Sequence, residues 1–153
     1  GMLRCDIEAA LSIGMTTATQ RSRALAIAAG NFVSARPLGV IDGIDMGYTG
    51  RVRKIDTESI RQRLDSGALV LISPLGHSLS GKTFNLSMGD IAEAAAIALA
   101  AEKLIYVVEQ EGILNEHGTL ISNLSAQEAR ELLDNQRVQP NQRRLLQSAV
   151  NAV

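Results

Sequence analysis

The chain has 153 residues, of which 46% are hydrophobic and 20% charged, and its formal net charge is −1. This composition is typical of a soluble globular chain and argues against disorder. The balanced charge provides no basic surplus, so we expect no nucleic-acid and no membrane partner. Cys5 is the single cysteine, which excludes an internal disulfide, fits a reducing cytoplasm and argues against a zinc site.

Helices are expected where apolar residues recur at steps of three and four residues. The predicted helices cover residues 3–11, 19–29, 57–64 and 126–135, with an alanine-rich helix after Ser87 and a last helix after Pro140. Gly30 and Gly67 would end the second and third of these, and Thr57 would be the N-cap of the third.

Strands are expected where β-branched residues lie between turn signals. They are predicted at about residues 31–37, 44–47, 50–55, 68–73 and 103–108, the last two as strands buried on both faces. The order strand, helix, strand predicts an α/β fold: a three-layer, largely parallel sheet with helices on both faces and an added β-hairpin. We expect one domain over residues 2–153, with Gly1 typical of the scar of a removed tag.

The loop from Ser73 to Phe84 would lie at the carboxyl end of a strand, where α/β folds bind ligands. Gly76 and Gly81 would let the backbone approach a ligand, and Ser78, Ser80 and Asn85 could form hydrogen bonds. A plain surface loop explains these residues equally well. The Gly81-Lys82-Thr83 segment lacks the spacing of a phosphate-binding P-loop.

Other polar residues have structural explanations that we favour. His77 could be a general base, but no nucleophile or orienting residue accompanies it at a recognisable spacing. Asp42 and Asp45 flank a predicted hairpin turn. A further set could contact an anion or protect a solvated strand edge, namely Arg51, Arg53 and Lys54.

Several long segments together resemble one family. They read AAGNFVSARPLGVIDGIDMGYTGRVRKID, DSGALVLISPLGHSLSGKTFNL and AEKLIYVVEQEGIL. Their order and spacing are similar to the amino-acid kinase domain of bacterial N-acetylglutamate synthase, which is related to N-acetylglutamate kinase. The resemblance covers the chain from about Leu3 into the final helix.

The resemblance implies a part of an amino-acid N-acetyltransferase, which transfers acetyl from acetyl-CoA to glutamate in arginine biosynthesis. It implies that the kinase-like domain supports feedback control by arginine and oligomer assembly, while a separate acetyltransferase domain, absent here, performs the chemistry. The chain itself would then need no cofactor. Its possible ligands would be L-arginine or N-acetylglutamate, with the arginine site around the final helix. Arg143 and Arg144 lie near that region but match none of the family's arginine contacts.

The resemblance also implies a ligand cleft. Its residues would be Ser73, Pro74, Leu75 and Gly76 in the strand-end loop, Asn85 at the position that holds the N-acetylglutamate α-carboxylate, and Glu109 and Gly112 beside the nucleotide. In the kinases an aspartate follows that asparagine by four residues, a position that is Gly89 here. No catalytic residue is therefore expected. The alternatives are a residual acylamino-acid kinase and a noncatalytic oligomerisation module.

Overall fold

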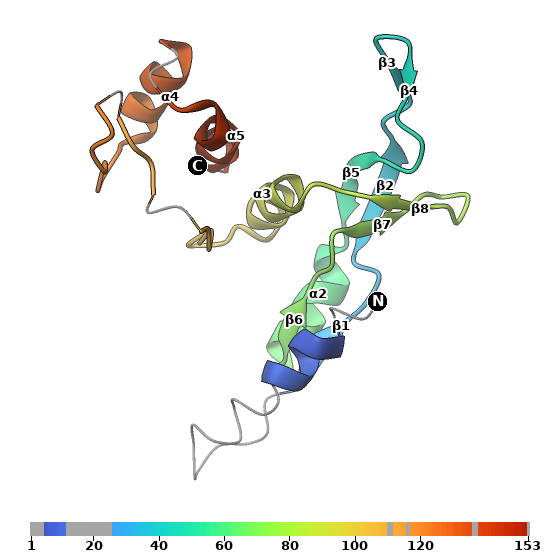
Figure 1. Ribbon diagram of the computed structural model, residues 1–153. Helices are drawn as coiled ribbons and strands as arrows, with labels where there is room; N and C mark the ends of the chain where they lie inside the picture. The colour runs from blue at the N-terminus through green and yellow to red at the C-terminus, as the bar shows by residue number, and fades with distance from the viewer. Residues whose placement is uncertain (1–4, 12–25, 110–111, 116, 136–137, 153) are drawn as a thin grey trace. The chain divides into compact units, whose positions relative to one another are not determined.

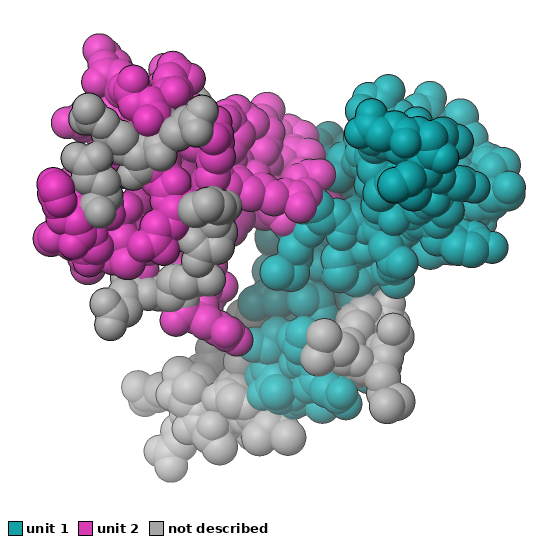
Figure 2. All heavy atoms as spheres, turned by 45° about the horizontal axis from the view of Figure 1, so that its top comes forward, with its two compact units in different colours: residues 1–88 teal, residues 89–153 magenta. Residues whose placement is uncertain are grey.

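The computed structural model describes residues 5–11, 26–109, 112–115, 117–135 and 138–152 (Figure 1). The chain divides into two compact units, Gly1–Met88 and Gly89–Val153 (Figure 2). The predicted α/β class is confirmed, and the sheets are mixed, with both parallel and antiparallel pairs.

The first part of unit 1 is a helix at residues 5–11 and a two-stranded parallel sheet of β1 (Ile27–Ala29) and β6 (Leu69–Leu71). Residues 3, 4 and 19–25 of the predicted helices lie outside the described residues. The helix prediction is wrong for residues 27–29, which pair with β6 in the register Ile27↔Leu69. Pairing with a strand distant in sequence overrides the helix propensity of this alanine-containing segment.

A four-stranded sheet has the order β5-β2-β7-β8. Its strands are β2 (Val33–Pro37), β5 (Gly50–Ile55), β7 (Leu75–His77) and β8 (Thr83–Asn85). β2 pairs with β5 and β7 with β8 in antiparallel fashion, while β2 pairs with β7 in parallel. The strand prediction for residues 50–55 is confirmed, whereas the predicted loop at residues 73–84 is instead the β7–β8 hairpin and its turn.

A second hairpin consists of β3 (Val40–Ile41) and β4 (Ile44–Asp45). Its turn residues Asp42 and Gly43 both have positive φ, 51° and 80°. This is the conformation of a type I′ turn, which the Asp-Gly pair favours. The turn predicted from this pair is confirmed.

The helix α2 (Thr57–Asp65) packs its Ile60 into the core of unit 1, where that side chain is 1% exposed. Its N-cap is Asp56, one residue before the predicted Thr57, because the Asp56 carboxylate accepts the Ser59 backbone N–H at 3.1 Å. Gly67, with φ of 79°, follows the helix as predicted. The buried apolar side chains of unit 1 are Phe32, Val33, Ala35, Ile55, Ile60, Ala68, Phe84 and Leu86.

Unit 2 contains helices and non-helical connections in its described part. Its helices are α3 (Met88–Leu99), which begins at the unit boundary, α4 (Ala126–Asp134) and α5 (Pro140–Asn151). A cluster of buried side chains joins α4 to α5, formed by Ala129, Leu133, Val138, Leu146 and Val150. The helices predicted at residues 126–135 and after Pro140 are confirmed.

The strand predicted at residues 103–108 is wrong. The structure assigns no strand to this segment, and Ile105 and Val107 are 78% and 95% exposed. An apolar run becomes a buried strand only where neighbouring strands accept its hydrogen bonds. No strand in the described part of the chain pairs with these residues.

Candidate functional site

The β7–β8 hairpin brings together most of the residues predicted to line a cleft. Leu75 and Asn85 are register partners, and the Leu86 N–H donates to the Pro74 carbonyl at 3.0 Å. The Asn85 backbone N–H donates to the Tyr48 carbonyl at 2.8 Å. Asn85 is exposed, so its side-chain amide is presented at the surface of a rigid hairpin. An amide on such a support can donate hydrogen bonds to a carboxylate.

Gly76 is buried in β7 and brings parts of unit 1 into close contact. A Cβ at this position would lie 2.7 Å from Leu86 Cδ1 and 2.8 Å from Ala35 Cβ. The sequence suggests that Gly76 allows the backbone to approach a ligand. In the folded unit, side chains of the same unit fill the space beside its Cα.

The segment from Ser78 to Lys82 is the turn of this hairpin. The Ser78 N–H donates to the Lys82 carbonyl at 2.8 Å, and the Gly81 N–H donates to the Ser78 carbonyl at 3.0 Å. Gly81 has φ of 79°, which glycine adopts without strain. Lys82 and Thr83 lead into a strand, whereas the corresponding residues of a P-loop begin a helix. This geometry supports the rejection of a P-loop.

His77 lies in β7 and is half-buried rather than in a solvated loop. Its Nδ1 lies 2.8 Å from Asn31 Oδ1. Because an amide oxygen only accepts, the imidazole donates through Nδ1 and keeps Nε2 as its other polar atom. The orienting group is an amide, not the carboxylate of a catalytic triad. The contact therefore fixes the ring without forming a nucleophile-activating relay.

Glu109 and Gly112 belong to unit 2, so the predicted cleft residues are divided between the two units. Glu109 is exposed. The Gly112 carbonyl accepts the Gln142 side-chain N–H at 2.6 Å, and Gln142 Oε1 accepts the Leu114 N–H at 3.0 Å. Gln142 is 3% exposed and attaches this connection to α5. Sequence analysis missed Gln142, because its type and position alone do not indicate burial.

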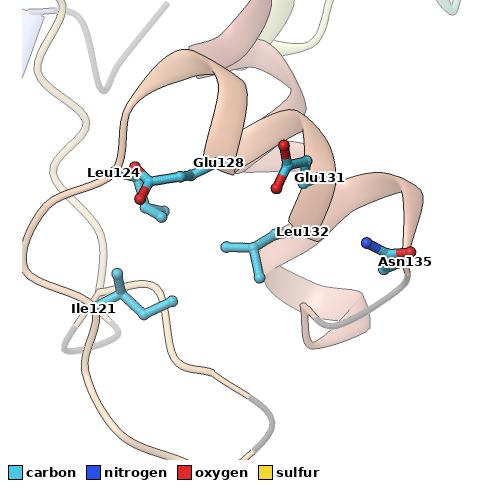
Figure 3. Close-up of a pocket in the computed structure, with 6 residues that line it drawn as sticks. All are labelled: Ile121, Leu124, Glu128, Glu131, Leu132 and Asn135. Atoms are coloured by element: carbon cyan, nitrogen blue, oxygen red, sulfur yellow. The ribbon is translucent and has the colours of Figure 1, made fainter.

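A cleft of about 270 Å³ lies along α4 in unit 2 (Figure 3). Its apolar residues are Ile121, Leu124 and Leu132, and its polar residues are Glu128, Glu131 and Asn135. An apolar surface beside carboxylates suits a cationic ligand with an aliphatic stem. The sequence indicates an acidic helix at residues 126–135. It does not indicate the cleft, because the cleft forms only where the connection at residues 121–124 packs against that helix.

The two carboxylates of this cleft have different surroundings. Glu128 closes a capping box with Ser125, whose backbone N–H it accepts at 2.8 Å. This hydrogen bond, with a second from the Ser125 hydroxyl, lowers the pKa of Glu128 below its ordinary value. Glu131 accepts a hydrogen bond from the Gln127 side chain at 3.1 Å. Glu131 is therefore the carboxylate that does not take part in capping the helix.

A second cleft in unit 2 has the opposite charge. It is about 340 Å³ and is lined by Arg143, Arg144, Gln147 and Ser148 of α5. Arg143 donates to the Leu133 carbonyl at 3.3 Å, and Arg144 lies 3.5 Å from Asp90 in an exposed ion pair. Guanidinium groups at this position suit a carboxylate ligand better than a cation.

Across the residues that the structure describes, no group of three histidine, cysteine, aspartate or glutamate side chains is arranged to hold a metal ion. Cys5 is exposed at the start of the helix at residues 5–11. None of the described helices combines the length and apolar character needed to cross a bilayer.

Comparisons with known proteins decide the family. The model of the amino acid kinase family matches residues 7–153. The chain belongs to the amino acid kinase family. Over all 153 residues it is 47% identical to the amino-acid acetyltransferase of Neisseria meningitidis serogroup B and covers 34% of that protein. Over 128 residues, 84% of the chain, it is 48% identical to the amino-acid acetyltransferase of Azotobacter vinelandii and covers 30% of it.

Solved structures agree with this assignment. N-acetylglutamate synthase from Neisseria gonorrhoeae, complexed with coenzyme A and L-arginine, matches with a TM-score of 0.88 at 46% identity, over 99% of this chain and 35% of that one. The same enzyme with coenzyme A and N-acetyl-glutamate matches with a TM-score of 0.78 at 49% identity, over 84% of this chain and 30% of that one. The chain thus spans about a third of the length of the relatives it matches.

Proposed function

We propose that this chain is the kinase-like regulatory and assembly part of an N-acetylglutamate synthase, the enzyme that acetylates glutamate in arginine biosynthesis. The observation that carries the proposal is the 46% identity and TM-score of 0.88 to a synthase solved with coenzyme A and L-arginine, over 99% of the chain. Acetyl-CoA would be used by the whole enzyme and not by this part, which would work in the cytoplasm as a homo-oligomer.

Phosphoryl transfer is not proposed. Gly89 stands where the resemblance places the aspartate that organises the catalytic lysines of the kinases. The neighbouring carboxylate, Asp90, lies 3.5 Å from Arg144 in an exposed ion pair. Phosphoryl transfer depends on electrostatic stabilisation by positioned groups. A glycine contributes no such group, so we expect no hydrolysis or transfer from Mg-ATP.

L-arginine is the ligand we propose for unit 2, at the cleft along α4. Its guanidinium would lie near Glu131, and its aliphatic stem would lie on Leu124 and Leu132, which line the same cleft. A guanidinium pairs with a carboxylate through two parallel hydrogen bonds. The proposal therefore assigns recognition of the side chain to Glu131 and leaves Glu128 to cap the helix.

Thermal-shift titration and calorimetry with L-arginine test this proposal, beside N-acetylglutamate and Mg-ATP. A ligand that binds only the folded state stabilises it by about 2.7 kcal/mol at a hundredfold excess over its Kd. Citrulline, which has nearly the same shape without the charge, is the matched ligand control. We expect arginine to raise the melting temperature and citrulline to have little effect.

The variant Glu131→Gln locates the site. It keeps the size of the side chain and removes the charge, and we expect it to weaken arginine binding about tenfold or more, by about 1.4 kcal/mol or more. Glu102→Gln, an exposed change elsewhere in unit 2, is the matched protein control. Unchanged affinity in Glu131→Gln would remove arginine from this cleft, and no arginine binding by the unaltered chain would refute the regulatory proposal.

A further inference from the structure

The four-stranded sheet of unit 1 has one apolar face and one polar face. Successive side chains of a strand point to opposite faces of a sheet. In β2, Val33 and Ala35 are buried in the core, so Ser34 and Arg36 lie on the other face. Arg36 is exposed there. The strand register then shows which side chains of the neighbouring strands share this polar face.

Three cationic side chains gather on the polar face. Arg36 is the register partner of Arg51, and Ser34 is the register partner of Lys54. Because partners on paired strands lie side by side on one face, Arg36, Arg51 and Lys54 are neighbours. All three are exposed, and none forms an ion pair with a residue that the structure describes. On its other side, Ser34 has His77 of β7 as its partner.

The carboxylate next to this group has other hydrogen-bond partners. Asp56 accepts the Ser59 backbone N–H at 3.1 Å through Oδ1 and the Ser59 hydroxyl at 2.7 Å through Oδ2. These two hydrogen bonds lower the pKa of Asp56, and Lys54 lowers it to a smaller extent. The two arginines therefore have no carboxylate partner within the described residues.

Protection of a sheet edge explains only part of this arrangement. Exposed cations on an edge strand discourage pairing with other chains, and β5 is an edge strand. Arg36, however, belongs to β2, which lies between β5 and β7 (Figure 1). Like charges directly opposite each other destabilise a sheet. An anion between Arg36 and Arg51 would remove this repulsion.

We propose that the polar face of this sheet binds a phosphate group between Arg36 and Arg51, with Lys54 adding a third positive charge. Two guanidinium groups can each donate two hydrogen bonds to a tetrahedral phosphate. The phosphate would be free or part of a larger molecule. This site belongs to unit 1 alone and is independent of the arginine proposal for unit 2.

Calorimetry of the whole chain with inorganic phosphate tests the site, in chloride buffers of constant ionic strength. Arg36→Gln and Arg51→Gln should each weaken binding at least about tenfold, because each removes one charged donor group. Arg63→Gln is the matched control, since it removes the same charge from an exposed position on α2. It should leave the affinity unchanged.

Methyl phosphate distinguishes the two sources of the group. Binding of methyl phosphate as well as inorganic phosphate would support a site for a phosphate that is part of a larger molecule. Binding of inorganic phosphate alone would support a site for the free anion.

Stability without phosphate provides a second measurement. Arg36→Gln should raise the urea midpoint in phosphate-free buffer, because it removes the repulsion between Arg36 and Arg51. A lower midpoint would show that the arginine pair stabilises the fold itself and would overturn the proposal. So would an absence of phosphate binding by the unaltered chain, or equal weakening in Arg63→Gln. Binding of polyglutamate but not of phosphate would replace the phosphate with an acidic protein partner.

Discussion

The two units support their candidate ligand-binding residues in different ways. In unit 1, Asn85 and the residues before it belong to paired strands, and Gly76 permits contacts that a side chain would block. In unit 2, Gly112 belongs to a connection that is held by hydrogen bonds from one buried side chain of α5, Gln142, and by Ile113, which packs against the cluster of α4 and α5. Close backbone packing thus fixes one set of residues, and a buried polar side chain together with apolar packing fixes the other. Each mechanism predicts a different sensitivity to mutation.

The largest expected effect is in unit 1, at Gly76. The variant Gly76→Val places a Cβ 2.7 Å from Leu86 Cδ1 and 2.8 Å from Ala35 Cβ, and adds two methyl groups beyond it. Overpacking of this kind costs about 1–3 kcal/mol, and here we expect the upper end because a strand holds the position. Urea unfolding followed by circular dichroism measures the loss.

A double-mutant cycle shows whether the clash is the cause. Ala35→Gly removes the methyl group that opposes Gly76, so it should recover part of the stability lost in Gly76→Ala. Strictly additive losses would show that the close approach of β2 and β7 does not require glycine. In that case a direct role of Gly76 at a ligand would become the better explanation.

The next effect is in unit 2, at Gln142. Gln142→Leu preserves bulk but leaves the Gly112 carbonyl and the Leu114 N–H without their partner. We expect a loss of about 1–3 kcal/mol, since partly buried backbone groups lose their hydrogen bonds. Gln147→Leu makes the same change at an exposed position of the same helix and should cost little.

Hydrogen exchange distinguishes a local effect from a general one at Gln142. The amide of Leu114 should lose protection in Gln142→Leu, while amides of the β7–β8 hairpin in unit 1 should keep theirs. Equal loss in both units would contradict the view that Gln142 serves only the connection at residues 112–114.

Sequence patterns predicted elements that local chemistry determines. Asp42-Gly43 indicated a turn, and Pro140 marked the start of α5, because these residues restrict their own backbone. The patterns predicted the wrong secondary structure where pairing with a segment distant in sequence determines it. Residues 27–29 form a strand through pairing with β6, and residues 103–108 have no described partner despite their apolar character. The cleft along α4 and the burial of Gln142 likewise depend on packing between segments.

The smallest effect concerns acid stability, for which each unit has a helix-capping carboxylate. Asp56 accepts the Ser59 backbone N–H and then its hydroxyl, and Glu128 accepts the corresponding groups of Ser125. These hydrogen bonds lower the pKa of each carboxyl in the folded state. A depressed folded-state pKa stabilises the protein above the unfolded-state pKa of about 4, and this stabilisation is lost as pH falls through the folded-state value.

Stability measured between about pH 2 and pH 6 should therefore decline less steeply in Asp56→Asn, because asparagine also caps helices but does not titrate. Glu128→Gln should produce a similar change in unit 2. Since Asp56 and Glu128 are both on the surface, salt should weaken the charge-dependent part of each effect. If Asp56→Asn and the unaltered chain lose stability in parallel on acidification, the acid sensitivity of unit 1 lies in other carboxylates and not in the cap of α2.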